Sequence, residues 1–272
     1  MVNLAQFSLV DTGHSARLLR PDPFDFVSFN KKRLVVTVGD SWSWGADMSY
    51  NNNDSYRINN HFGTTIAKSL NADWLSLSQC GSGNFWMLDK IQELAKIISK
   101  LDYQHIYIIC TLTETGRAIF TRQDVDFYSF FKDNHLDKFI AFLNNTCVDN
   151  IVTALSSFTN VTLRVGTNFV DYVGDDRDFL LQSPWLKLMC RHHQMSYTGN
   201  CQIVSPWVLD DLYQLKGLMP LQKFNNLLTM LTDLTSIALE RETLICTVPG
   251  IRHLHPDACG HQLWANYVLN SF

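Results

Sequence analysis

The sequence predicts one α/β domain in which a mainly parallel sheet lies between two layers of helices. Short β-branched runs alternate with longer segments whose apolar residues recur at helical spacing. The runs at 34–38 and 105–111 are largely apolar without alternation, as in parallel strands that are buried on both faces. This regular succession of strands and helices favours a three-layer α/β/α fold.

The first half of the chain contains three of the expected strands. Leu88, Ile91 and Leu94 fall at helical spacing and predict the longer of its two helices. A stretch rich in Asn, Asp and Ser is typical of a loop at the carboxyl edge of the sheet. The expected order is strand 34–38, loop 47–60, helix 62–70, strand 74–77, helix 85–100 and strand 105–111.

The second half continues the alternation. The expected order is helix 137–157, strand 161–165, polar loop 166–178, helix 184–191, strand 201–204, helix 221–241, strand 244–248 and helix 259–269. No internal repeat, low-complexity segment or linker interrupts it. We therefore expect an irregular N-terminal arm, residues 1–33, packed on one domain, residues 34–272.

Composition argues against several classes of protein. The chain has 272 residues, of which 46% are hydrophobic, enough to bury a sizeable core. Its net charge is −4 and it has no long basic run, so a nucleic-acid partner is not expected. No apolar run reaches the ~20 residues of a membrane helix, and residues 1–10 do not resemble a signal peptide. These features predict a cytoplasmic protein with no membrane partner.

The cysteines do not suggest a disulfide framework. There are seven, an odd number, and none has CxxC spacing. Cys110 and Cys246 lie in apolar runs, which is typical of buried free thiols in a reducing compartment. We expect no metal and no other cofactor.

A serine follows the first expected strand. Gly39-Asp40-Ser41 ends the run at 34–38, and Gly39 allows a sharp turn where open α/β sheets place their ligands. Ser41 is therefore expected at the mouth of the sheet. A strand-to-loop turn without chemistry is the alternative.

This stretch resembles the first block of the GDSL, or SGNH, hydrolases, in which a Gly-Asp-Ser follows the first strand. The resemblance implies the flavodoxin-like arrangement of that family, with Ser41 as the nucleophile. Acyl transfer also requires donors for an oxyanion. Residues 78–84 resemble the family's second block, where a glycine donates a backbone N–H and an Asn follows. Gly81 and Asn84 match it, with Gly83 as the less favoured register and a purely geometric glycine turn as the alternative.

The third block departs from the family pattern. The family has Gly-x-Asn-Asp after a strand, whereas residues 110–117 read Cys-Thr-Leu-Thr-Glu-Thr-Gly-Arg. We expect the Thr113 hydroxyl to replace the Asn amide, because the loss of one oxyanion donor typically costs ~3 kcal/mol of barrier. Arg117 either pairs with an anionic substrate group or forms a structural ion pair.

The C-terminal stretch 252–265 resembles the last block of the family, in which His-Pro leads into Gly-His and a terminal helix. The resemblance implies that His255 is the base for Ser41, since a serine needs a base to take its proton. A helix-capping loop histidine is the alternative. We expect His253 and His261 to be structural, because no carboxylate or cysteine pattern supports a metal site here.

The acid of the triad is missing from its usual place. Where the family has Asp, three positions before His255, this chain has Arg252. Either the enzyme works as a Ser-His dyad, or an acid comes from elsewhere. Asp257 and the pair Asp175-Asp176 are the candidate acids, and the sequence does not choose between them.

The expected function is that of a serine esterase or deacylase acting on a small-molecule or carbohydrate ester, such as an O-acetyl group on a sugar. One alternative is an O-acyltransferase on the same fold, in which a sugar hydroxyl replaces water. Another is a non-catalytic binding protein on a degenerate hydrolase scaffold. The missing Asp and Asn favour that last reading, while Ser41 and His255 argue against it.

Overall fold

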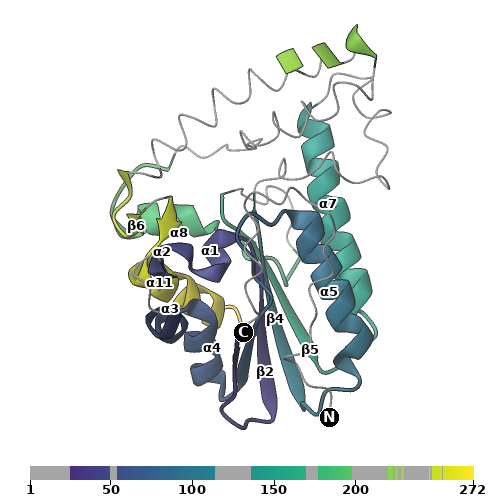
Figure 1. The fold of residues 1–272 in the computed structure, drawn as a ribbon, viewed down its shortest axis with the longest axis vertical. Coiled ribbons are helices and arrows are strands. Elements are labelled where there is room, and N and C mark those ends of the chain that lie inside the picture. Colours follow the sequence, from purple (N-terminus) through teal and green to yellow (C-terminus); the bar gives the residue numbers. More distant parts are fainter. Residues whose placement is uncertain are drawn as a thin grey trace.

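The structure is a computed structural model. It describes residues 25–49, 54–113, 136–169, 177–197, 220–222, 224–225, 228–229, 245, 247–252 and 254–272, with backbone only for 49, 136–144 and 252. The expected α/β class is confirmed. Its helices pack on both faces of one sheet (Figure 1).

Within the described residues the sheet has five strands, of which four are parallel. Their order is β1-β3-β2-β4-β5. β1 (Phe26–Val27) runs antiparallel to β3 at one edge, and β2 to β5 are mutually parallel. The parallel strands are β2 (Arg33–Gly39), β3 (Asp73–Ser76), β4 (His105–Leu112) and β5 (Val161–Thr167).

In chain order these four strands are arranged 2-1-3-4, as in flavodoxin-like sheets. The connection from β2 leads to β3 on one side, and the connection from β4 leads to β5 on the other side. The direction of the strand order therefore reverses between β2 and β4. In folds of this kind ligands bind at such a switch point, outside the carboxyl ends of the strands. The topology therefore directs attention to the residues that follow Gly39 and Leu112.

The helices form two layers. α5 (Asn84–Ile98) and α7 (Leu136–Leu155) lie side by side on one face of the sheet (Figure 1). The other face is covered by α4 (Phe62–Leu70), α8 (Trp185–His192) and α11 (Ala258–Leu269). Three short helices lie on the same side toward the carboxyl edge: α1 (Ser41–Trp44), α2 (Ala46–Ser49) and α3 (Asp54–Asn60).

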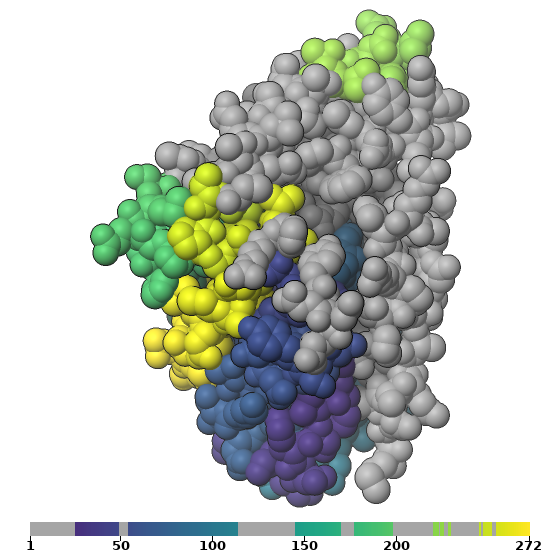
Figure 2. All heavy atoms as spheres, turned by 60° about the vertical axis from the view of Figure 1, so that its left-hand side comes forward, coloured from purple at the N-terminus to yellow at the C-terminus, as the bar shows by residue number. Residues whose placement is uncertain are grey.

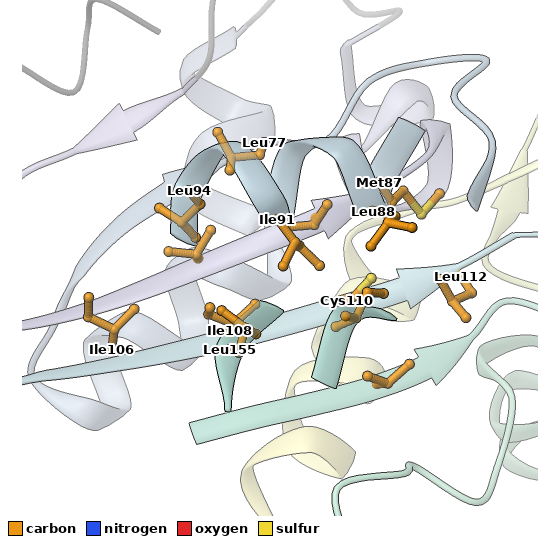
Figure 3. Close-up of a cluster of buried hydrophobic side chains, with 14 of the residues drawn as sticks. Leu77, Met87, Leu88, Ile91, Leu94, Ile106, Ile108, Cys110, Leu112 and Leu155 are labelled. Atoms are coloured by element: carbon orange, nitrogen blue, oxygen red, sulfur yellow. The ribbon is translucent and has the colours of Figure 1, made fainter. Parts of the chain in front are cut away.

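The core between the sheet and α5/α7, here called the aliphatic layer, contains buried aliphatic and sulfur-containing side chains (Figure 3). Residues at alternate positions of β2 and β4 point into it, because successive side chains of a strand face opposite sides. α5 and α7 each contribute residues spaced three or four apart. Members of the layer include Leu34, Val36, Val38, Ile106, Ile108, Cys110, Leu88, Ile91, Leu94, Val148 and Ile151.

The core on the opposite face, here called the aromatic layer, is built around six large rings. Trp185 and Trp264 stack with their planes 8° apart, and Trp42 meets Trp185 edge-on at 87°. α11 lies against α3 and α4, so segments far apart in the chain share this core (Figure 2). The six rings are Trp42, Phe62, Trp74, Phe169, Trp185 and Trp264.

Two expected elements are wrong. The expected loop 47–60 contains α2 and α3, and the expected strand 244–248 is helical at its two described interior positions, Ile245 and Thr247. Ile245 and Val248 are both buried in the aromatic layer, and their spacing of three positions suits one face of a helix. Residues 201–204 and most of 221–241 lie outside the described residues.

α3 is held by contacts that local sequence does not reveal. Arg57, 3% exposed, forms a bidentate ion pair with Asp25 at 2.6 and 2.8 Å. Its guanidinium also lies 4.4 Å from the centre of the Trp44 ring. These contacts override the loop preference of the Asn- and Ser-rich stretch and join α3 to the start of β1. No helix in the described part of the chain combines the length and apolarity needed to cross a bilayer.

Candidate active site

Ser41 lies where β2 ends and α1 begins. Asp40 caps this helix, its Oδ1 accepting a hydrogen bond from the Trp42 N–H at 3.0 Å. The turn is tight: a Cβ on Gly39 would lie 2.2 Å from Ser43 Oγ. Only glycine therefore fits before Asp40, and the chain reverses so sharply that Ser41 remains at the carboxyl edge of the sheet, 8% exposed.

The segment after β3 is attached to the same turn. The Gln79 N–H and the Ser82 hydroxyl both donate to the Gly39 carbonyl, each at 3.0 Å. Gly81, between them, has φ +78°, a conformation that favours glycine. The turn carrying Gly81 is therefore fixed on the backbone two residues before Ser41.

The segment after β4 is attached in turn to the start of α5. The Asn84 side chain bonds both backbone groups of Thr113: Oδ1 accepts from the Thr113 N–H at 2.8 Å, and Nδ2 donates to the Thr113 carbonyl at 3.2 Å. Both residues are buried. The Asn84 amide thus holds the Thr113 backbone at the edge of the sheet.

His255 lies in a hairpin that packs against the turn carrying Ser41. β6 (Ile251–Arg252) pairs with β7 (His255–Pro256), and Leu254 has φ +67° in the turn between them. β7 packs on α1 and α2. The Trp42 indole Nε1 donates to the Leu254 carbonyl at 2.8 Å. The residue after Ser41 is therefore bonded to the residue before His255.

The described residues do not identify which carboxylate would complete a triad with Ser41 and His255. Asp257 caps α11, its Oδ1 accepting from the N–H groups of Cys259 at 2.8 Å and Gly260 at 3.1 Å. Asp175 and Asp176 lie outside the described residues. In the hairpin register Arg252 is directly opposite His255.

Two buried histidines lie behind the candidate site. His61 caps α4, its Nδ1 accepting from the Gly63 N–H at 2.9 Å, and its Nε2 bonds the Ser43 carbonyl at 2.5 Å. His261 accepts from the Phe62 N–H at 3.3 Å through Nδ1. Burial lowers the pKa of His61 to about 3, and burial with the nearby His61, Arg57 and His255 lowers the pKa of His261. These shifts favour the neutral form of both rings, and the His261 ring packs in the core against Phe62 and Trp185.

Some of the residues singled out in the sequence lie outside the described part of the chain, and others are buried. Arg117 and His253 lie outside the described residues. No three His, Cys, Asp or Glu side chains gather as a metal-binding group within the described ranges. Cys110, Cys147 and Cys190 are buried and none of the three forms a disulfide, and burial raises the pKa of Cys110 and Cys190.

Asn168 is the residue at this edge that the sequence analysis missed. It directly follows β5, and its Nδ2 donates to Asp40 Oδ1 at 2.9 Å. The available signal was an amide placed immediately after a parallel strand, the same kind of position that identified Ser41. It was obscured because residues 166–178 read as one continuous polar loop.

Comparison with known proteins gives little guidance. No family model matches this chain, and no curated protein matches it. One similar solved structure is that of a carbohydrate esterase whose active site is described as displaying divergent catalytic and non-catalytic binding functions. It is 13% identical, with a TM-score of 0.31, over 89% of this chain and 68% of the other. A similarity of this size does not establish a shared activity.

Proposed function

We propose that this chain is a serine esterase or deacylase of the GDSL/SGNH type, with Ser41 as nucleophile and His255 as base. The observation that carries the proposal is the 2.8 Å hydrogen bond from Trp42 Nε1 to the Leu254 carbonyl. It joins the neighbour of Ser41 to the neighbour of His255 across most of the chain. A nucleophile and its base must lie within reach of one proton transfer.

The reaction begins when Ser41 Oγ attacks the carbonyl carbon of the ester and His255 accepts the hydroxyl proton. The negative charge on the former carbonyl oxygen needs donors that are already in place. The backbone N–H groups of Ser41 and Gly81 fill this role. The turn carrying Gly81 is suited to it because two hydrogen bonds fix it on Gly39.

In this mechanism Thr113 assists at the oxyanion, and Asn84 acts indirectly. The Asn84 amide is engaged with both backbone groups of Thr113, so its role is to hold Thr113 in position. This assignment refines the expectation that both residues line the substrate site.

His255 then gives its proton to the leaving alcohol, and the acyl group remains on Ser41. Water attacks the acyl-enzyme, His255 again acts as base, and the acid is released. Asp257 caps α11 through Oδ1, and Asp175 and Asp176 lie outside the described residues, so the proposal is a Ser-His dyad or an incomplete triad with no acid assigned. In this mechanism the hairpin that carries His255, fixed by Trp42, holds the imidazole near Ser41.

Hydrolysis of p-nitrophenyl acetate tests the proposal. We expect the wild type to release acetate, and Ser41→Ala to lose the activity. His255→Gln should lower kcat by about 10²–10⁴-fold, the usual contribution of a general base. A matched control is His192→Gln, because His192 lies at the end of α8 and has no part in the proposed mechanism.

The same assay separates the alternatives. Transfer of acetate to an added sugar instead of water would indicate an O-acyltransferase. Activity that Ser41→Ala retains would contradict the proposal, and so would the absence of any turnover.

A further inference from the structure

Asn168 connects three parts of the fold at the carboxyl edge of the sheet. Its backbone N–H donates to the Leu112 carbonyl at the end of β4 at 2.9 Å, and its carbonyl accepts from the Leu186 N–H in α8 at 3.0 Å. Its side chain reaches Asp40 at 2.9 Å. Asn168 is fully buried, so both backbone bonds hold the amide in a defined place.

Asp40 depends on such donors because its side chain is only 1% exposed. A buried carboxylate is costly unless N–H groups bond to it. The Trp42 N–H bonds Asp40 within the local turn. The Asn168 amide comes from a different strand, so it fixes the turn relative to the rest of the sheet.

Backbone contacts also fix the turn on its other side. The Gly39 carbonyl accepts from Gln79 and Ser82 of the segment after β3. Gly39 is therefore held from the β3 side of β2, and Asp40 is held from the β5 side, across the end of β4. Ser41 is the next residue, and its position depends on both attachments.

We propose that Asn168 is a positioning residue for the nucleophile, acting through Asp40 to hold Ser41 in the orientation from which it attacks the ester. This inference rests on the proposed function. Asn168 does not touch the substrate. Its removal lowers kcat and leaves KM unchanged, because displacement of a reacting group by about 1 Å can cost roughly a hundredfold in rate.

A double-mutant cycle on the full chain tests the inference with p-nitrophenyl acetate as the probe. Asn168→Ala is combined with Asp40→Ser, which retains a side chain able to cap α1 but too short to keep the contact with Asn168. We expect Asn168→Ala to lower kcat by about 10- to 100-fold in the wild type and by less than about twofold in the Asp40→Ser background. KM should stay within about twofold throughout.

Two further variants control for folding. Asn168→Ser retains a polar side chain and both backbone bonds of residue 168, and should reproduce the loss in kcat with a thermal transition close to that of the wild type. Asn150→Ala makes the same change at an exposed asparagine of α7 and should change nothing.

The outcomes are distinguishable from failure of the proposed function. If hydrolysis depends on Ser41 but Asn168→Ala leaves kcat unchanged, raises KM instead, or lowers kcat equally in both backgrounds, only this inference is overturned. If Ser41→Ala is as active as the wild type, the proposed function and this inference are overturned together.

Discussion

The two faces of the sheet are covered by different kinds of side chain, and the two layers have different roles in the fold. The aliphatic layer under α5 and α7 contains no buried aromatic ring among its described members. The described part of the aromatic layer on the other face contains six large ones. Aliphatic side chains bury apolar area without directional preference, whereas tryptophan brings both a large ring and an N–H that needs a partner.

Three indole donors of the aromatic layer, those of Trp42, Trp74 and Trp185, join distant segments. Trp42 bonds the Leu254 carbonyl at 2.8 Å, Trp185 bonds the Gly260 carbonyl at 3.0 Å, and Trp74 bonds Thr37 Oγ1 at 3.0 Å. Two of these three bonds reach the C-terminal stretch that carries His255. The aliphatic layer thus mainly stabilises the sheet, while the aromatic layer also brings the C-terminal hairpin to the turn that carries Ser41.

Removing the central ring of the aromatic layer should have the largest effect on stability. Trp185 is fully buried between Trp42, Phe62 and Trp264. Trp185→Ala should lower the free energy of unfolding by about 3–5 kcal/mol, because it opens a large cavity and leaves the Gly260 carbonyl without its donor. Urea denaturation measures this. Trp185→Phe, which keeps a ring, should cost distinctly less, and an equal loss would contradict the importance of the stacking.

The second largest effect on stability should come from acid, which should lower the free energy of unfolding through two buried histidines beside the aromatic layer. The pKa of His61 is about 3 in the folded protein against 6.5 in the unfolded chain, and that of His261 is also lowered. Below pH 6.5 the unfolded chain binds protons that the folded one does not, so stability is fully present above pH 6.5 and is lost as the pH falls toward 3. In this window His61 should cost about 1.4 kcal/mol of unfolding free energy for every pH unit, and His261 shifts the stability in the same direction.

Urea denaturation between about pH 7.5 and about pH 5.5 measures this slope. His61→Asn retains a residue able to cap α4 and removes one titrating group. Its unfolding free energy should therefore fall less steeply as the pH is lowered than that of the wild type, by the contribution of about one proton. If the unfolding free energy of the variant depends on pH as steeply as that of the wild type, His61 does not cause the loss of stability in acid.

A smaller change in the aromatic layer should separate stability from activity. Trp42→Phe keeps a ring but removes the donor to the Leu254 carbonyl, and should cost about 1–2 kcal/mol of unfolding free energy and about tenfold in kcat. The matched control is Trp74→Phe, which removes the buried bond to Thr37 Oγ1 instead of a bond to the hairpin. It should cost similar stability with no loss of kcat. Equal losses of kcat in both variants would contradict the role given to Trp42.

The smallest effect is expected in the aliphatic layer. Ile108 is fully buried there, and Ile108→Val removes one methylene group. The expected loss is about 0.5–1.5 kcal/mol of unfolding free energy, with kcat and KM unchanged. A fall in kcat would show that this layer also controls the site.

The sequence predicts the elements that depend on local patterns, and it does not predict those that depend on contacts between distant segments. Strands such as 34–38 and 105–111 and helices such as 85–100 are found because burial on both faces and helical spacing are local patterns. α3 was missed because it depends on Arg57 contacting Asp25 and Trp44, which are remote in sequence. Ser41, Gly81 and His255 were expected from short motifs. The Asn84–Thr113 and Asp40–Asn168 pairs follow from strand order, which no motif encodes.

The central claim is that Ser41 and His255 work as a pair. Its most direct test is the rate at which a fluorophosphonate modifies Ser41, followed by mass spectrometry of the labelled peptide in the wild type and in His255→Gln. We expect modification at Ser41 in the wild type and a rate slower by about a hundredfold or more in the variant. Equal rates in the two proteins, or no modification of Ser41 in the wild type, would contradict the claim.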